Sequence, residues 1–364
     1  MNNSTNGNSS APGAEGGSVA AALSWQGILT LQGVVMLIVN GFLSYVIIKV
    51  KELHKKEYVL PLGMAIGDTL SGYCLIVTTV YRSYLFVTRQ ITVLVSPWQC
   101  FIETPFMISM IWSLWWQPIM LLFTSMDRFL ACFSVLTYMK IKYVHVSIIC
   151  GLGIFLSFML CVATGVLAYM LPHEPIVAAV CFSYTIMPLW ASNATFWGQN
   201  GTVLAAVLVY FIAVFNLHWG PDTATTEVLK QNKERQKKVT NMLLLVMLSN
   251  LMFMFVPYMI FYFMSNMDVN PRTVATLLTI FVTLVNINLL NNPFLFFLKN
   301  GDIRAAMIKI VPALKTAENL MISTSVGPSD AETSMTKLKS RFSRKSKGNV
   351  SSVVKATDET SKTA

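Results

Sequence analysis

The stretch VTNMLLLVMLSNLMFMFVPYMIFYFM, residues 239–264, decides the fold class. It carries no charged side chain and exceeds the roughly 20 residues that a helix needs to cross a bilayer core. Pro257 within it would break a helix in a soluble protein but is tolerated in a membrane bundle. Six further apolar runs lie at 26–49, 58–81, 98–131, 146–170, 200–219 and 272–298. These runs predict an all-α membrane protein, a seven-transmembrane helix bundle, rather than a very apolar soluble core.

The composition agrees with a membrane protein. Of 364 residues, 54% are hydrophobic and 12% are charged, against about 25% charged in soluble domains. The net charge of +10 would favour nucleic acid on a polar fold, but here the basic residues lie between apolar runs. We therefore expect a basic cytoplasmic face and no nucleic-acid partner. The six cysteines and four histidines are too scattered for a metal site, and no cofactor is predicted.

Lysine and arginine indicate the orientation. Of the 27, only Arg82, Arg89 and Arg272 follow spans two, four and six, and the other 24 lie on the opposite side. Positive residues stay in the cytoplasm, so the N-terminus is expected outside and the C-terminus inside, in the plasma membrane. Five N-x-S/T sequons, candidate glycosylation sites, open on the predicted outer side: Asn2, Asn3, Asn8, Asn193 and Asn200.

Four regions follow from this topology. Residues 1–25 are expected to be a disordered extracellular segment, and 26–298 the bundle. Residues 299–312 are expected to form a short amphipathic eighth helix at the interface, the alternative being a frayed end of span seven. Residues 313–364, poor in large apolar side chains, are predicted to be a disordered cytoplasmic tail.

Several polar residues lie within the spans, where they are costly and often functional. Asp68 is the one acid deep in a span, and Asn40, Asn288 and Asn292 lie in spans one and seven. We expect them to meet in the bundle interior as a polar core, with a sodium ion at Asp68 as a further hypothesis. The alternative is that they only join helices by hydrogen bonds.

Three local patterns then occur in a fixed order. Asp127-Arg128-Phe129 closes span three, Pro257 lies within span six, and Asn292-Pro293-Phe294-Leu295-Phe296 closes span seven. Each pattern alone carries little information. Their order and their positions in spans three, six and seven carry much more.

Over roughly residues 26–311 the chain resembles the rhodopsin-like (family A) G-protein-coupled receptors. Asn40 and Asp68 are similar to the family's span-one asparagine and span-two aspartate, 28 residues apart. Arg128 looks like the arginine of the D/E-R-Y motif, with Phe129 in the tyrosine's place. Pro257 resembles the span-six proline, with Phe255 where tryptophan is usual. Asn292 and Pro293 match N-P-x-x-Y, with Phe296 replacing the tyrosine.

The chain also departs from this family pattern. Residues 146–170 contain no tryptophan, and residues 200–219 contain no proline. Cys100 lies further from Arg128 than is usual, and a kink at Pro118 is one way to absorb the extra length. The aromatic-for-tyrosine replacements and many methionines look most like nematode chemosensory receptors of the Srsx type.

The resemblance implies a receptor, chemosensory or orphan in role, that senses an extracellular ligand and activates a heterotrimeric G protein through a shift between two bundle packings. The implied switch residues are Asp127, Arg128, Phe129, Pro257, Asn292, Pro293 and Phe296. Arg128 has a second interpretation, a charge reaching the membrane surface. In this family an acidic residue of span six commonly pairs with the span-three arginine. Lys237 and Lys238 occupy that region here, so we expect the inactive state to be held weakly.

Other functions remain as alternatives. A neuropeptide receptor of the same fold is the first. A transporter or channel is less favoured, since no internal repeat is visible. An enzyme is not expected, because Asp68 has no second carboxylate or histidine at its depth. Arrestin and kinases are possible partners at the tail, and the lipid bilayer is the surrounding partner.

The ligand is constrained only in part. Residues 272–298 contain no lysine for a retinal Schiff base, and span three has no aspartate near Met110 for an amine. Aromatic residues of spans three and six remain as candidates for a pocket, although packing is a competing interpretation. These candidates are Met110, Trp112, Trp115, Phe255, Tyr258 and Tyr262. Cys100 and Cys181, the cysteines placed outside, are predicted to form a disulfide.

Overall fold

Seven helical segments form the bundle, as the sequence predicted. The computed structural model describes residues 13–90, 93–171, 174–183, 185–219, 227–265, 267 and 271–315. Within these residues, seven segments are long and apolar enough to cross a membrane. They are α1 (Gly13–Lys49), α2 (Val59–Val87), α4 (Met107–Phe133), α6 (Tyr143–Met170), α7 (Leu189–Trp219), the joined α8 (Glu227–Asn250), η3 (Leu251–Phe255) and α9 (Val256–Ser265), and α10 (Pro271–Lys299).

Shorter elements join and cap these helices. Two 3-10 turns, η1 (Lys51–Leu53) and η2 (Lys56–Tyr58), connect α1 to α2. The remaining elements are α3 (Pro97–Glu103), α5 (Val135–Lys140), α11 (Gly301–Ile310), β1 (Leu94–Val95) and β2 (Val177–Ala178). Helix α11 lies within the predicted 299–312. The chain up to Arg304 is one compact unit, and Ala305 begins another.

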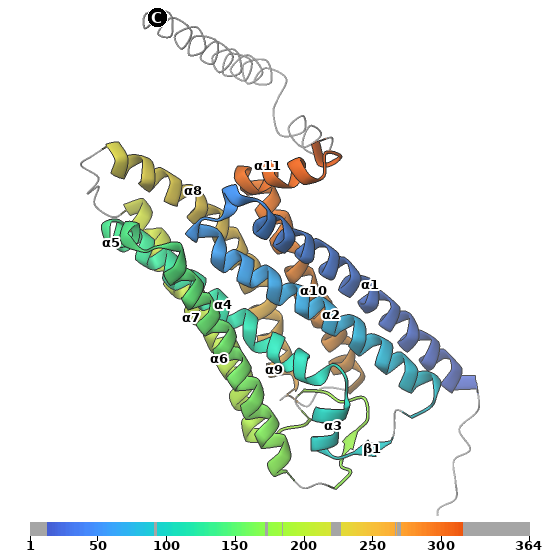
Figure 1. Cartoon of the computed structure of the whole chain (residues 1–364). Coiled ribbons are helices and arrows are strands. Elements are labelled where there is room, and N and C mark those ends of the chain that lie inside the picture. Colours follow the sequence, from blue (N-terminus) through green and yellow to red (C-terminus); the bar gives the residue numbers. More distant parts are fainter. Residues whose placement is uncertain are drawn as a thin grey trace, which may run out of the picture. The chain divides into compact units, whose positions relative to one another are not determined.

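Helices α1 and α2 lie side by side along much of their length (Figure 1). Two glycines permit the close approach: a Cβ added at Gly33 would lie 2.9 Å from the carbonyl oxygen of Gly72. In the same region the hydroxyl oxygens of Thr30 and Thr79 are 2.7 Å apart. In a bilayer, burial of apolar surface contributes little to the association of helices. Close packing at small residues and interhelical hydrogen bonds stabilise the contact instead.

Helix α4 is central, since it packs against α2, α6 and α7 (Figure 1). Its buried Trp116 donates its indole N–H to the carbonyl of Gly63 on α2 at 2.9 Å. Trp112 donates to the hydroxyl of Ser157 on α6 at 3.0 Å. The outward side of α6 keeps large apolar residues such as Phe155 exposed, as a lipid-facing helix requires. The helix that carries Arg128 is thus held from three sides.

The predicted third span, 98–131, needs correction because it is two helices. Ser96 and Gln99 form a capping box that starts α3, and α3 ends before Thr104, whose backbone is extended. Thr104 precedes Pro105, and a residue before proline disfavours the helical conformation. The extra length between Cys100 and Arg128 is therefore absorbed by this break, and α4 runs through Pro118 to Phe133.

The sixth span changes its helical pattern just before Pro257. Residues Leu251–Phe255 are π-helical, and α9 then begins at Val256. Proline removes one backbone donor and crowds the preceding turn, so a wider turn there relieves the conflict. Helix α1 begins at Gly13, but its membrane-crossing part, Leu23–Lys49, starts close to the predicted residue 26. The fifth span begins at Leu189 rather than near 200.

The end of the bundle opposite Arg128 carries the predicted disulfide. Cys100 of α3 is bonded to Cys181, with Cα atoms 5.8 Å apart. Strand β1 pairs antiparallel with β2 just before Cys181. Arg82 of α2 donates to the carbonyls of Val180 and Cys181 at 3.2 and 3.1 Å. These contacts fix the segment between α6 and α7 over the ends of α2 and α3.

Candidate functional site

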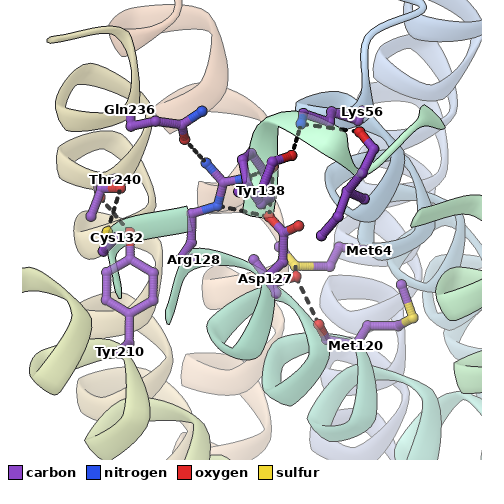
Figure 2. A network of polar contacts seen from close by, with 12 residues as sticks. Lys56, Met64, Met120, Asp127, Arg128, Cys132, Tyr138, Tyr210, Gln236 and Thr240 are labelled. Atoms are coloured by element: carbon purple, nitrogen blue, oxygen red, sulfur yellow. Dashed lines mark hydrogen bonds and ion pairs between the residues drawn. The ribbon is translucent and has the colours of Figure 1, made fainter. Parts of the chain in front are cut away.

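Arg128 lies near the end of α4 and is almost completely buried, with 1% of its surface exposed. Its Nε donates to Asp127 Oδ2 at 2.9 Å, and its Nη2 also bonds this oxygen. Nη1 donates to Gln236 Oε1 at 2.9 Å, and Nη2 to Tyr138 Oη at 2.8 Å (Figure 2). An arginine that reached the membrane surface would be solvated, so the geometry opposes that interpretation.

Tyr138 belongs to α5, a helix that the sequence did not predict. Its hydroxyl accepts from Arg128 and donates to Asp127 Oδ2 at 3.4 Å. Burial raises the pKa of the Tyr138 phenol, so the hydroxyl keeps the proton that it donates. Tyr138 is 2% exposed. A tyrosine ten residues after Arg128 belongs to no motif that we used, and only the fold brings it back to the arginine.

Gln236 connects Arg128 to α8 and is a partner that the sequence did not indicate. The sequence suggested that span six holds Arg128 weakly, because Lys237 and Lys238 stand where an acid is familiar. The buried Gln236, one residue earlier, supplies the acceptor instead, while Lys237 is exposed. The acceptor is a neutral amide, so the bond is charge-assisted on one side only and weaker than an ion pair.

Further contacts join α8 to α4 and α7 beside Arg128. Tyr210 of α7 is fully buried, and its hydroxyl donates to the backbone carbonyl of Thr240 (Figure 2). Cys132 Sγ lies 4.0 Å from Thr240 Oγ1. Ser125 Oγ is 3.8 Å from the sulfur of Met247. These contacts therefore connect α4, α7 and α8 near Arg128.

Phe129, the third member of the motif, takes no part in these polar contacts. Its ring stacks on Phe133 with centroids 4.2 Å apart. Phe296, in the place of the N-P-x-x-Y tyrosine, is 1% exposed. It is a packing residue without a hydroxyl. Pro257 and Pro293 are both buried within their helical segments.

The polar core forms only in part as expected. Asp68 is 2% exposed, and its Oδ2 accepts from Asn292 Nδ2 at 3.0 Å. Its Oδ1 accepts from Gln117 Nε2 at 2.6 Å, a contact that the sequence reading missed. Asn40 instead donates to the carbonyls of Met36 and Leu289. Asn288 donates to Asn250 Oδ1 at 2.9 Å. Asn40 and Asn288 therefore do not join Asp68.

The contacts of Asp68 give no direct support to a sodium ion at this site. Both carboxylate oxygens of Asp68 accept hydrogen bonds from amide N–H groups. A cation coordinates oxygen atoms and would have to share these two with the amide donors. Among the residues that the structure describes, no group of three His, Cys, Asp or Glu side chains gathers around a point.

The predicted ligand-pocket residues do not all contact the same helix. Trp112 faces α6, where it bonds Ser157 and contacts Phe158, so its position opposes a role in an interior pocket. Trp115 is buried beside Gly198 of α7. Tyr262 stacks on Phe196 of α7, with ring centroids 4.7 Å apart.

The remaining pocket candidates are placed as follows. Tyr258 lies 6.5 Å from the ring of Phe196. Met110 packs on the buried cluster near the disulfide, and Phe255 is partly buried within η3. Phe196 and its neighbour Trp197, which is 5.1 Å from Tyr262, were missed because α7 begins earlier than predicted.

Of the predicted glycosylation sites, Asn2, Asn3 and Asn8 lie outside the described residues. Asn193 is exposed near the start of α7. Asn200 is 3% exposed, and its amide donates to the carbonyl of Phe196 at 2.9 Å. A glycan needs an accessible amide, so the structure does not support Asn200 as an acceptor.

Comparison with known proteins assigns the family. A search of curated proteins found no match. The family model for the 7 transmembrane receptor (rhodopsin family) matches residues 39–296. This match begins one residue before Asn40, ends at Phe296 and spans Arg128 with its partners Tyr138 and Gln236. The chain therefore belongs to the rhodopsin family of seven-transmembrane receptors.

Proposed function

We propose that this receptor senses an extracellular ligand and activates a heterotrimeric G protein at the end of the bundle that holds Arg128. One observation carries the proposal: a fully buried arginine joins α4, α5 and α8 through Asp127, Tyr138 and Gln236. An arginine buried in a membrane bundle is costly, so a functional role is the default explanation. Packing alone would be served by an apolar residue.

The mechanism is a shift between two packings. In the described packing, the Arg128–Gln236 hydrogen bond holds α8 against α4. A G protein that enters between these helices needs that bond to open, and the freed guanidinium then becomes available to the partner. A ligand favours this open packing only by binding it more tightly than the closed one.

The charge distribution supports a cytoplasmic location for Arg128 and a plasma-membrane orientation with the N-terminus outside. Twenty-four of the 27 lysines and arginines lie on the Arg128 side of the predicted topology. The serine- and lysine-containing tail at 313–364 is then cytoplasmic, where kinases and arrestin would act on it. The disulfide end faces outward, into an oxidising compartment.

The side chains between α4, α7 and α9 favour a small, largely apolar ligand. Tyr262, Phe196 and Trp197 form an aromatic cluster. The buried indole N–H of Trp115 has no hydrogen-bond partner in the described part of the chain, so it could donate to a hydrogen-bond acceptor on a ligand. These features support a chemosensory role. A neuropeptide with aromatic anchors is the second candidate.

The test is nucleotide exchange on a panel of purified G proteins with the receptor in lipid nanodiscs. We expect exchange above empty nanodiscs for at least one G protein. Replacing Asp127 by Ala removes a partner of Arg128 and should raise ligand-free exchange further, so the test does not depend on an identified ligand. Solute flux through liposomes containing the chain, with no exchange from either form, would favour a channel or transporter instead.

A further inference from the structure

Lys56 lies in η2, the turn that leads into α2, and reaches across to α5. Its ammonium group donates to the backbone carbonyl of Tyr138 and to that of Ile141 at 3.1 Å. The same Nζ lies 3.9 Å from the centroid of the Tyr138 ring. Figure 2 shows Lys56 meeting Tyr138 from one side while Arg128 meets it from the other.

The end of α5 is where a cation has most effect. The last carbonyls of a helix have no donor within the helix and form the negative end of its dipole. Ile141 is the residue that follows α5, and its carbonyl and that of Tyr138 both accept from Lys56. A helix of six residues is too short to be stable by itself, so α5 depends on such anchors.

Lys55 shows that position, rather than charge alone, distinguishes Lys56. Lys55 forms an ion pair with Asp302 at 3.0 Å, and its side chain is 40% exposed. Exposed ion pairs of this kind contribute little to stability. Two adjacent lysines of the same turn therefore point to different partners, and only Lys56 contacts α5 through the bonds described above.

We propose that Lys56 is a positioning residue for the Arg128 switch: it anchors the end of α5 and so places the Tyr138 hydroxyl between Asp127 and Arg128. The effect on signalling rests on the G-protein coupling proposed above. The effect on α5 does not. Lys56 acts at the backbone and ring of Tyr138, and Tyr138 transmits the effect through its hydroxyl.

The first experiment measures hydrogen exchange of the peptide covering residues 135–141 in the full-length receptor in nanodiscs, without G protein. In Lys56→Met we expect hydrogen exchange of this peptide to be faster by about tenfold, because the substitution removes a partly buried cation from the end of the helix. Lys55→Met, which removes the same charge from the neighbouring residue, should match the parent. Lys56→Arg should restore protection in large part. Equal protection in Lys56→Met and Lys55→Met would overturn the proposal.

The second experiment measures ligand-free nucleotide exchange. Lys56→Met should raise it roughly threefold or more, within the range by which single residues alter coupling. If Lys56 acts through Tyr138, adding Lys56→Met to Tyr138→Phe should raise exchange no further than Tyr138→Phe alone. Full additivity of the two substitutions would contradict this route.

The two failures can be told apart. If Lys56→Met leaves exchange at the parent level while Gln236→Leu raises it, the role of Lys56 in the switch is wrong and the receptor function stands. If no variant stimulates any G protein, the proposed function fails, and the hydrogen-exchange result alone decides whether Lys56 positions α5. Where Lys56→Met does not reach the membrane, Lys56→Gln, which removes the charge but keeps a donor, takes its place.

Discussion

At the scale of single residues, the bond between Arg128 and Gln236 sets how firmly the switch is closed. Gln236→Leu removes the acceptor and should raise ligand-free nucleotide exchange, by about threefold to tenfold. Gln236→Glu replaces a neutral acceptor by a carboxylate, which strengthens the bond to Arg128, and should lower exchange below the parent.

Lys237→Leu is the matched control, because Lys237 is the exposed neighbour of Gln236 on the same helix. Its exchange rate should equal that of the parent at equal receptor density. Equal rates for Gln236→Leu and Gln236→Glu would show that this bond does not hold the switch.

Asp68 provides a second prediction for single residues. Gln117→Ala leaves Asp68 Oδ1 without its amide donor, and an unsatisfied buried acceptor costs about 1–3 kcal/mol. The midpoint of thermal unfolding in detergent should therefore fall. For the parent, replacing sodium chloride by choline chloride at equal ionic strength should leave the midpoint unchanged. A sodium-specific stabilisation of the parent would show that the Asp68 site takes the ion after all.

Residues adjacent in a motif were predictable, whereas their distant partners were not. The Asp127–Arg128 pair is visible in the sequence because the two residues are neighbours. Gln236, 108 residues away, and Gln117, 49 residues from Asp68, come together only when helices pack. Glutamine has no charge and occurs in no motif that we used, so no local pattern indicates which one faces a buried ion.

At the scale of helices, the contact between α1 and α2 depends on glycine. A Cβ at Gly72 would lie 2.8 Å from the backbone nitrogen of Leu37, and backbone cannot move aside as a flexible side chain can. Gly72→Ala should therefore separate the helices and destabilise the receptor by about 1–3 kcal/mol. The readout is the thermal unfolding midpoint together with the yield of folded receptor.

Gly151→Ala on α6 is the control for this substitution, because nothing lies within 4 Å of an added Cβ there. It should leave the midpoint unchanged or raise it slightly, since alanine favours helix over glycine. The packing explanation fails if the two alanine variants unfold alike.

Hydropathy predicted the existence of the membrane helices but not the positions of all their ends. A long apolar run shows that a segment can cross a bilayer, yet a helix can continue past the run or break within it. Helix α7 extends back to Leu189, and the third span breaks at Thr104. Pro105 was the local signal for that break, whereas α5 and the β1–β2 pair depend on tertiary contacts.

At the scale of the whole molecule, the disulfide and the Arg128 contacts lie at different ends of the bundle. The Cys100–Cys181 bond closes a separation of 81 residues, and loss of such a bond typically costs about 2–4 kcal/mol. Cys100→Ser should therefore reduce stability and the amount of receptor at the cell surface. Because Arg128 and its partners stay intact, ligand-free exchange per folded receptor should stay close to the parent.

This prediction is checked by measuring exchange after normalising to folded receptor in nanodiscs. The double variant Cys100→Ser/Cys181→Ser controls for a new unpaired thiol. If either variant changed exchange per receptor several-fold, the two ends would be coupled more tightly than a local role for the disulfide allows.

The most direct test of the receptor mechanism is ligand-free nucleotide exchange by Gln236→Leu with and without Arg128→Ala. Arg128 lies about 27 Å along α4 from Met110 at 1.5 Å per residue, so its effect on signalling cannot arise from ligand contact. We expect Gln236→Leu to stimulate exchange above the parent, and the added Arg128→Ala to return it to the level of empty nanodiscs. Undiminished exchange without Arg128, at equal receptor density, would contradict the role of this residue as the switch that engages the G protein.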